Sequence, residues 1–209
     1  WPAGTYANVV MRITKDGLTV VVETPGRTVF NGFSRAEIDG DHINFSGFQY
    51  VGGSIGTSDV INIRGSDILF TQINIRAYTC YKYLRVREES QYVDISYCNF
   101  ENRINSADQN ILSILVNRTQ PGYHKIRHCS FKNFPGGGND EGVEPIRIGV
   151  SSQADFISRT LVEYCYFTTC DGDGEIISSK ATQNVYRFNT FDGNFKAELV
   201  LRHGSEAIV

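Results

Sequence analysis

Three carboxylates stand close together late in the chain, in the run Asp171-Gly172-Asp173-Gly174-Glu175. In an extended strand, Asp173 and Glu175 would face the same side, because successive side chains alternate. Two neighbouring carboxylates repel each other unless a cation lies between them, and Ca²⁺ is a hard ion that prefers oxygen ligands. The run therefore predicts either a calcium site or an acidic turn exposed to solvent.

A glycine-rich acidic segment, residues 135–142, precedes this run by about one repeat of the chain. It contains Asn139, Asp140 and Glu141, any of which could supply a third oxygen ligand to calcium. It lacks the Lys-[Ser/Thr] ending of a phosphate-binding loop, so it does not predict a nucleotide site. A flexible surface loop is the alternative interpretation.

Cationic side chains follow the acidic run. Lys180 comes shortly after Glu175, and Arg202-His203 follows about one repeat later, so these cations could lie on adjacent rungs of a repeating fold. Such a cluster would suit an anionic ligand; otherwise each is an ordinary exposed cation. Strict alternation sends Lys180 to the face opposite Glu175, so the cluster requires a bend at Ser178-Ser179.

Other catalytic arrangements find little support. The four histidines of the sequence have no evident Ser or Cys nucleophile as a partner. We expect His128 to be a surface or stacking residue. A pair of acids among Asp171, Asp173 and Glu175 could serve a glycoside hydrolase, which is the enzymatic alternative.

The elements that must position these residues repeat along the chain. An aromatic or apolar residue recurs at the same point of each repeat, at positions 50, 75, 100, 131, 167 and 191, with spacings of 25, 25, 31, 36 and 24 residues. A period of this size indicates stacked coils whose loops absorb the extra length. The expected strands are short and β-branched, such as 60–63, 83–86, 146–148 and 199–201. The pattern predicts an all-β fold, a right-handed single-stranded parallel β-helix with coils of about 25 residues.

Three of the five cysteines, Cys98, Cys129 and Cys165, share one register of this repeat. We expect them to be buried thiols that pack as small apolar groups. Cys80 and Cys170 are not assigned. No Cys/His spacing typical of a zinc site is present.

The composition sets broader limits. A net charge of −3 argues against a general nucleic-acid binder, although a local basic groove could still bind a polyanion. No stretch reaches the ~18 apolar residues of a membrane-spanning helix. We expect one domain over residues 1–209, and the uncapped strand at Ala207-Ile208-Val209 suggests a part of a longer solenoid.

Three stretches of the sequence form recognisable motifs: Glu144-Pro145-Ile146-Arg147-Ile148-Gly149, Glu175-Ile176-Ile177-Ser178-Ser179-Lys180 and Arg202-His203-Gly204. Together they resemble polysaccharide lyase family 6, the β-helix family of alginate lyases and chondroitinase B. The resemblance covers most of the chain from about Val22 onward. It implies β-elimination on a uronate-containing polysaccharide, with calcium as cofactor.

The resemblance also implies roles for individual residues. Calcium would be held by Asp173 and Glu175, and by Glu141 where the family has an asparagine. This departure leaves Asp140 and Asn139 as alternatives for the third ligand, and Asp173 stands where a longer glutamate is commoner.

The same resemblance makes Lys180 the base and Arg202 the acid, with His203 and Arg147 binding the substrate. A free lysine titrates at about 10.4 and is a poor base at neutral pH, so the mechanism needs positive charge nearby to favour its neutral form. Guanidinium stays protonated in proteins. We therefore expect Arg202 to stabilise the leaving oxygen while His203 or water delivers the proton.

The residues of the motifs that contain Glu175 and Arg202 favour alginate as the substrate, with dermatan sulfate as the alternative polymer. A polymeric substrate and the family together suggest a secreted or periplasmic protein. A β-helix fragment that binds anionic glycan without cleaving it is the alternative from another class of function.

Overall fold

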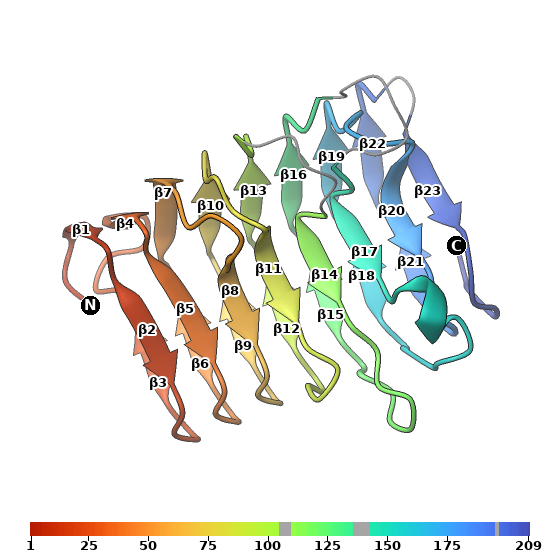
Figure 1. Ribbon diagram of the computed structural model, residues 1–209, viewed down its shortest axis with the longest axis horizontal. Coiled ribbons are helices and arrows are strands. Elements are labelled where there is room, and N and C mark those ends of the chain that lie inside the picture. The colour runs from red at the N-terminus through yellow and green to blue at the C-terminus, as the bar shows by residue number, and fades with distance from the viewer. Residues whose placement is uncertain (105–109, 136–142, 195–196) are drawn as a thin grey trace.

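The chain winds into a solenoid in a computed structural model that describes residues 1–104, 110–135, 143–194 and 197–209 (Figure 1). Each coil contributes one strand to each of three parallel sheets, so neighbours within a sheet are successive coils. This architecture confirms the predicted all-β parallel β-helix. Among the described residues, no helix has the length and apolar character needed to cross a membrane.

The strands are short, as expected from the sequence. Sheet 1 contains β1 (Gly4–Ala7), β4 (Thr28–Gly32), β7 (Gln49–Gly53), β10 (Asn74–Arg76), β13 (Asn99–Glu101), β16 (Ser130–Lys132), β19 (Tyr166–Thr168) and β22 (Thr190–Asp192). Sheet 2 contains β2 (Val10–Ile13), β5 (Arg35–Ile38), β8 (Asp59–Ile63), β11 (Lys82–Val86), β14 (Leu112–Ile114), β17 (Ile146–Ile148), β20 (Glu175–Ser179) and β23 (Glu198–Leu201). Sheet 3 contains β3 (Thr19–Val21), β6 (Asn44–Ser46), β9 (Leu69–Thr71), β12 (Asp94–Ser96), β15 (Lys125–Arg127), β18 (Leu161–Glu163) and β21 (Val185–Arg187), and a short 3-10 helix spans Ser151–Gln153.

The recurring aromatic residues form the inward row of sheet 1. Ile75 pairs with Tyr50 on one side and Phe100 on the other, and the row continues to Phe131 and Phe167. The rings of Phe100 and Phe131 stack with centroids 5.1 Å apart, and those of Phe131 and Phe167 with centroids 5.0 Å apart. Each coil thus covers the apolar face of the one before it, which confirms the repeat read from the sequence.

The cysteines behave as expected. Cys98, Cys129 and Cys165 are buried thiols in one register of successive coils, each within sulfur hydrogen-bonding distance of backbone carbonyl oxygens. Cys80 and Cys170, which the sequence left unassigned, are buried thiols as well. Burial raises the pKa of Cys80 and of Cys170, each to about 12, so these thiols stay protonated and unreactive at neutral pH.

A ladder of aromatic rings follows one corner of the solenoid on its outside. Tyr97, His128, Tyr164 and Phe188 all have left-handed backbone conformations, at the turn between a strand of sheet 3 and a strand of sheet 1. Their rings stack with centroids 4.9, 5.1 and 5.0 Å apart along the coils. The expectation that His128 stacks at the surface is confirmed. Ring stacking helps to offset the cost of a left-handed conformation in non-glycine residues.

One buried histidine makes stability depend on pH. His124 is 2% exposed, and its Nδ1 accepts a hydrogen bond of 3.2 Å from the Val93 amide. Burial lowers the pKa of His124 to about 4, well below its ordinary value near 6.5. The unfolded chain therefore binds the proton first as the pH falls, and the folded state is destabilised progressively between pH 6.5 and 4.

We predict that the free energy of unfolding falls by about 3 kcal/mol from pH 7 to pH 4 through this residue. Urea denaturation at both pH values, on the wild type and on His124→Gln, measures this loss. The variant should lose that part of the pH dependence, whereas His128→Gln, at the exposed stacked ring, should keep it. An equal pH dependence in wild type and His124→Gln would contradict the prediction.

Candidate active site

The last three strands of sheet 2 carry the predicted catalytic and binding residues. Arg147 on β17 pairs in register with Ser178 on β20, and Ser178 pairs with Val200 on β23. Lys180 directly follows β20, and Arg202 directly follows β23. Neighbouring strands in a sheet are ~4.8 Å apart, so side chains on the outer face of these strands lie within reach of one another.

A register shift in β20 resolves the conflict over Lys180 and Glu175. The pairing of β20 with β23 is irregular between Glu175 and Ile177, which is the signature of a β-bulge. Ile176 and Ile177 are both fully buried, so the alternation of sides is interrupted there. The expected bend at Ser178-Ser179 is not where the change occurs: both residues belong to the strand. The bulge instead brings Glu175 and Lys180 to the same side.

Glu175 and Arg202 form an ion pair. Arg202 Nη1 donates to Glu175 Oε1 at 2.6 Å, between a carboxylate that is 9% exposed and a guanidinium that is 53% exposed. Burial alone would raise the pKa of Glu175. The Ser178 hydroxyl and the positive charges of Arg202 and Lys180 outweigh it, and the pKa lies below its ordinary value. Glu175 therefore carries its negative charge at neutral pH.

The second oxygen of Glu175 is available for another partner. Within the described part of the chain, Glu175 Oε2 is buried and makes no hydrogen bond of good geometry, although the Ser178 hydroxyl lies close enough to lower the pKa of the carboxyl group. A buried carboxylate oxygen normally has a hydrogen-bond partner, and a hard cation is a suitable partner. Calcium is therefore compatible with this side chain.

Asp173 precedes β20 and is not part of a strand, so period-two alternation does not align it with Glu175 as the sequence suggested. Its Oδ1 accepts a short hydrogen bond from the amide of Gly174. Glu141, Asp140 and Asn139 lie outside the described residues. Among the described residues, no group of three His, Cys, Asp or Glu side chains could hold a metal ion.

Glu144 is the buried centre of the cationic cluster, and the sequence assigned it no role. Its side chain is 2% exposed, one oxygen accepts a short hydrogen bond from Arg147 Nε, and the other lies 3.8 Å from Lys180 Nζ. Burial raises the pKa of Glu144 although Arg147 and Lys180 both oppose the rise. The only signal in the sequence was its place in the same motif as Arg147.

His203 is exposed and is positioned by the turn after β23. The amides of Arg202 and His203 both donate to the carbonyl oxygen of Ser179, at 3.0 and 3.2 Å, which fixes this turn beside Lys180. Gly204 has φ of +79°, and a Cβ there would lie 2.6 Å from the Ala181 carbonyl carbon and oxygen. The close approach of two coils therefore requires glycine at position 204, directly after His203.

Two further polar residues lie near this site and were missed in the sequence. Lys82 begins β11, and its burial together with the charges of Arg85, Arg147 and Arg103 lowers its pKa to about 7. Asn110 is fully buried next to Ile111, whose amide donates to the carbonyl oxygen of Glu144, and neither polar atom of the Asn110 side chain has a partner among the described residues. Burial of such groups depends on neighbouring coils and has no local sequence signal.

Removing the Glu144 carboxylate should destabilise the protein strongly. Glu144→Ala leaves Arg147 and Lys180 close together without their buried counter-charge, and we predict a loss of about 3–5 kcal/mol in the free energy of unfolding. Chemical denaturation measures this value. Glu101→Ala, which removes the partner of the half-exposed Arg76, should cost less than about 1 kcal/mol. Similar losses in both variants would show that Glu144 is not the anchor of the cluster.

Comparisons with known proteins identify the fold and the family. The family model for chondroitinase B matches residues 2–209. The solved PL6 family alginate lyase AlyGC is 26% identical with a TM-score of 0.89, over 99% of this chain and 30% of that one. A mannuronic acid specific family 6 lyase from human gut microbiota is 28% identical with a TM-score of 0.85, over 97% of this chain and 49% of that one. The alginate lyase AlyF-OU02, solved with G6, shares the fold at 21% identity, with a TM-score of 0.86, over 97% of this chain and 46% of that one.

No curated protein sequence matches the chain significantly. The chain spans less than half the length of the solved relatives that it matches. The match to the chondroitinase B model nevertheless extends over nearly every residue, and the likeness to the solved lyases covers the coils that carry Lys180 and Arg202. The chain therefore belongs to the chondroitinase B family, within polysaccharide lyase family 6.

Proposed function

We propose that this chain carries the catalytic coils of a calcium-assisted lyase that cleaves a uronate-containing polysaccharide, most favourably alginate, by β-elimination. The observation that carries the proposal is the juxtaposition of Lys180, Arg147, Arg202 and the two carboxylates of Glu144 and Glu175 at the end of sheet 2. Family membership supplies the reaction class. The solved relatives named as alginate lyases support alginate as the polymer.

Calcium would be held by Glu175 through its buried Oε2, by Asp173, and by Glu141 as the third ligand, with Asp140 and Asn139 as alternatives to it. When bound, it would neutralise the sugar carboxylate and favour the negative charge that develops on that group during proton removal. Bound calcium would also offset the negative charge of Glu175 at Oε2, because Arg202 contacts the other oxygen, Oε1.

Lys180 acts as the general base. In its neutral form, Nζ accepts the proton from C5 of the uronate, the C5–H electrons form the C4–C5 double bond, and the C4–O bond breaks. Glu144 then stabilises the resulting ammonium, because its Oε1 lies 3.8 Å from Nζ. Arg147 lies on the other oxygen of Glu144, where its guanidinium would orient the substrate carboxylate.

The leaving oxygen departs with the C4–O electrons and needs a proton. Arg202 is half-exposed, and its ion pair with Glu175 raises the pKa of its guanidinium, so it stabilises the oxygen by hydrogen bonding and does not give up a proton. His203, held beside Lys180 by the turn after β23, or a water molecule delivers the proton.

The substrate partner in this proposal is an anionic polysaccharide: alginate, with dermatan sulfate as the other polymer to test. A protein that degrades such a polymer would act outside the cytoplasm, in the periplasm or after secretion. A β-helix that binds anionic glycan without cleaving it is the second candidate, because the chain spans only part of its solved relatives.

Unsaturated product is the direct test. Wild type incubated with alginate and calcium should produce new ultraviolet absorbance from the C4–C5 double bond, and a chelator should abolish it. Lys180→Ala should reduce the rate at least about 100-fold, because general-base catalysis contributes roughly that much or more. Lys125→Ala, at an exposed lysine of sheet 3, is the matched control and should keep the wild-type rate.

Binding of calcium is measured separately by calorimetry, where Asp173→Asn should weaken the affinity. A folded protein that binds alginate but yields no absorbance on either polymer would favour the non-catalytic candidate. Absorbance with dermatan sulfate and not with alginate would make dermatan sulfate the substrate and leave the proposed mechanism unchanged.

The division of roles between Arg202 and His203 gives a second test. Arg202→Lys keeps a positive charge near the leaving oxygen and should retain most of kcat, whereas His203→Ala should lower kcat by about 100-fold. Steady-state kinetics on alginate, with the two variants side by side, measures both values. The reverse ranking would make Arg202 the proton donor.

A further inference from the structure

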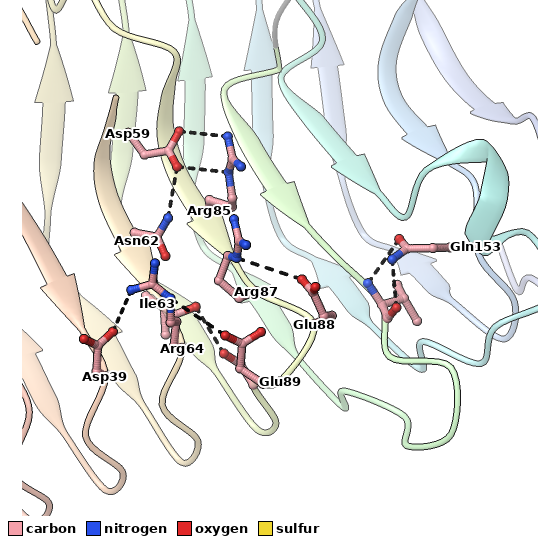
Figure 2. A network of polar contacts seen from close by, with 12 residues as sticks. Asp39, Asp59, Asn62, Ile63, Arg64, Arg85, Arg87, Glu88, Glu89 and Gln153 are labelled. Atoms are coloured by element: carbon pink, nitrogen blue, oxygen red, sulfur yellow. Dashed lines mark hydrogen bonds and ion pairs between the residues drawn. The ribbon is translucent and has the colours of Figure 1, made fainter. Parts of the chain in front are cut away.

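A polar cavity lies on the same outer face of sheet 2, several coils before the candidate active site. It has a volume of about 370 Å³ and is lined by residues of β5, β8 and β11 and of the segments beside them: Arg35, Glu37, Asp59, Asn62, Arg64 and Arg85 among others. Figure 2 shows Asp59 held between Asn62 and Arg85, and Arg64 between Asp39 and Glu89.

The cavity is built on a buried charge pair. Arg85 donates from one guanidinium nitrogen to Asp59 at 3.1 Å, while a second nitrogen lies 3.0 Å from the other oxygen. The side chains are 17% and 8% exposed, and Asn62 donates to Asp59 at 3.0 Å. Fixed in this way, the guanidinium is a rigid part of the cavity wall.

Three buried polar atoms in the cavity lining have no hydrogen-bond partner within the described residues: Nε of Arg35, Oδ1 of Asn62, and Nε of Arg85, which lies within ion-pair distance of Asp59. The two Nε atoms are donors and the Asn62 oxygen is an acceptor. Buried polar atoms are normally paired, so this combination points to a ligand that offers both an acceptor and a hydroxyl donor.

Three guanidinium groups line the cavity. Arg35, Arg64 and Arg85 face two carboxylates of the lining, Glu37 and Asp59, while Asp39 and Glu89 pair with Arg64 from beside the lining. Guanidinium groups form strong paired hydrogen bonds with carboxylates. A sugar acid carries both the carboxylate and the hydroxyl groups that such a lining suits.

The cavity and the candidate active site share one row of the sheet. Pairing in register connects Glu37 to Asn62, then to Arg85, Ser113 and Arg147, and finally to Ser178 beside Lys180. From Asn62 to Ser178 there are four strand spacings of ~4.8 Å, or roughly 19 Å. One linear polymer lying along this row could contact both places.

We propose that this cavity is a remote subsite for one uronate unit of the polymer whose cleavage is proposed above, on which this inference rests. Arg35 and Arg64 bind its carboxylate, and Asn62 accepts from a hydroxyl group. The subsite makes recognition depend on the length of the oligosaccharide, because a trisaccharide bound at Lys180 cannot span four strand spacings and an octasaccharide can.

The test compares two chain lengths in the double variant Arg35→Ala/Arg64→Ala, with trimannuronate and octamannuronate as probes. Calorimetry gives the affinities, and ultraviolet absorbance gives kcat/KM. We expect the ratio of octasaccharide to trisaccharide affinity to fall about tenfold, from the loss of two charge-assisted contacts. Arg76→Ala, at a half-exposed arginine of sheet 1, is the matched control and should leave the ratio unchanged.

The outcomes separate this subsite from the lyase proposal. An unchanged ratio in the double variant, or an equal fall in Arg76→Ala, overturns the subsite whether or not the protein cleaves the polymer. If wild type forms no unsaturated product and the ratio of affinities still falls in the double variant, the subsite stands and the lyase proposal fails. Circular dichroism of each variant, matching wild type, shows that the fold is intact.

Discussion

In-register pairing between successive coils is the constraint on which the rest of this structure depends. Each strand pairs in parallel with the strand one coil away, so a residue is placed above and below residues at the same point of the repeat. Inside sheet 1 this aligns Phe100, Phe131 and Phe167 into a stack of rings. The stack buries apolar area that no single coil could bury alone, and it leaves little tolerance for a slip in register.

The same register that orders the interior also orders the outer face of sheet 2. A side chain that points outward on one strand has outward neighbours at ~4.8 Å on both sides. Arg147 therefore lies beside Ser113 and Ser178 because the inward rows fix it there. A polymer with repeating charge meets a surface that repeats along the same axis, which is why a solenoid suits a linear polyanion.

One departure from regular pairing lies where the chemistry is proposed. The irregularity in β20 between Glu175 and Ile177 lets Glu175 and Lys180 share one side of the strand. The buried carboxylate of Glu144 contacts both Lys180 and Arg147. A regular strand would place the acid and the base on opposite faces, so the bulge is a requirement of the site and not a defect of the sheet.

The sequence by itself determined the coil, its period and the identity of the inward row, because stacking repeats the same residue types at each turn. It also indicated that Lys180 and Arg202 could lie on adjacent rungs, since their spacing is close to one coil, and the pairing of β20 with β23 places them there. Only the tertiary structure decided that Asp173 stands outside the strand, that a bulge reorients Glu175, and that Glu144 is the buried partner of the cations. The remote cavity around Asp59 and Arg85 was equally invisible, because burial and charge pairing arise between coils more than twenty residues apart, where a periodic pattern specifies the register but not the contacts.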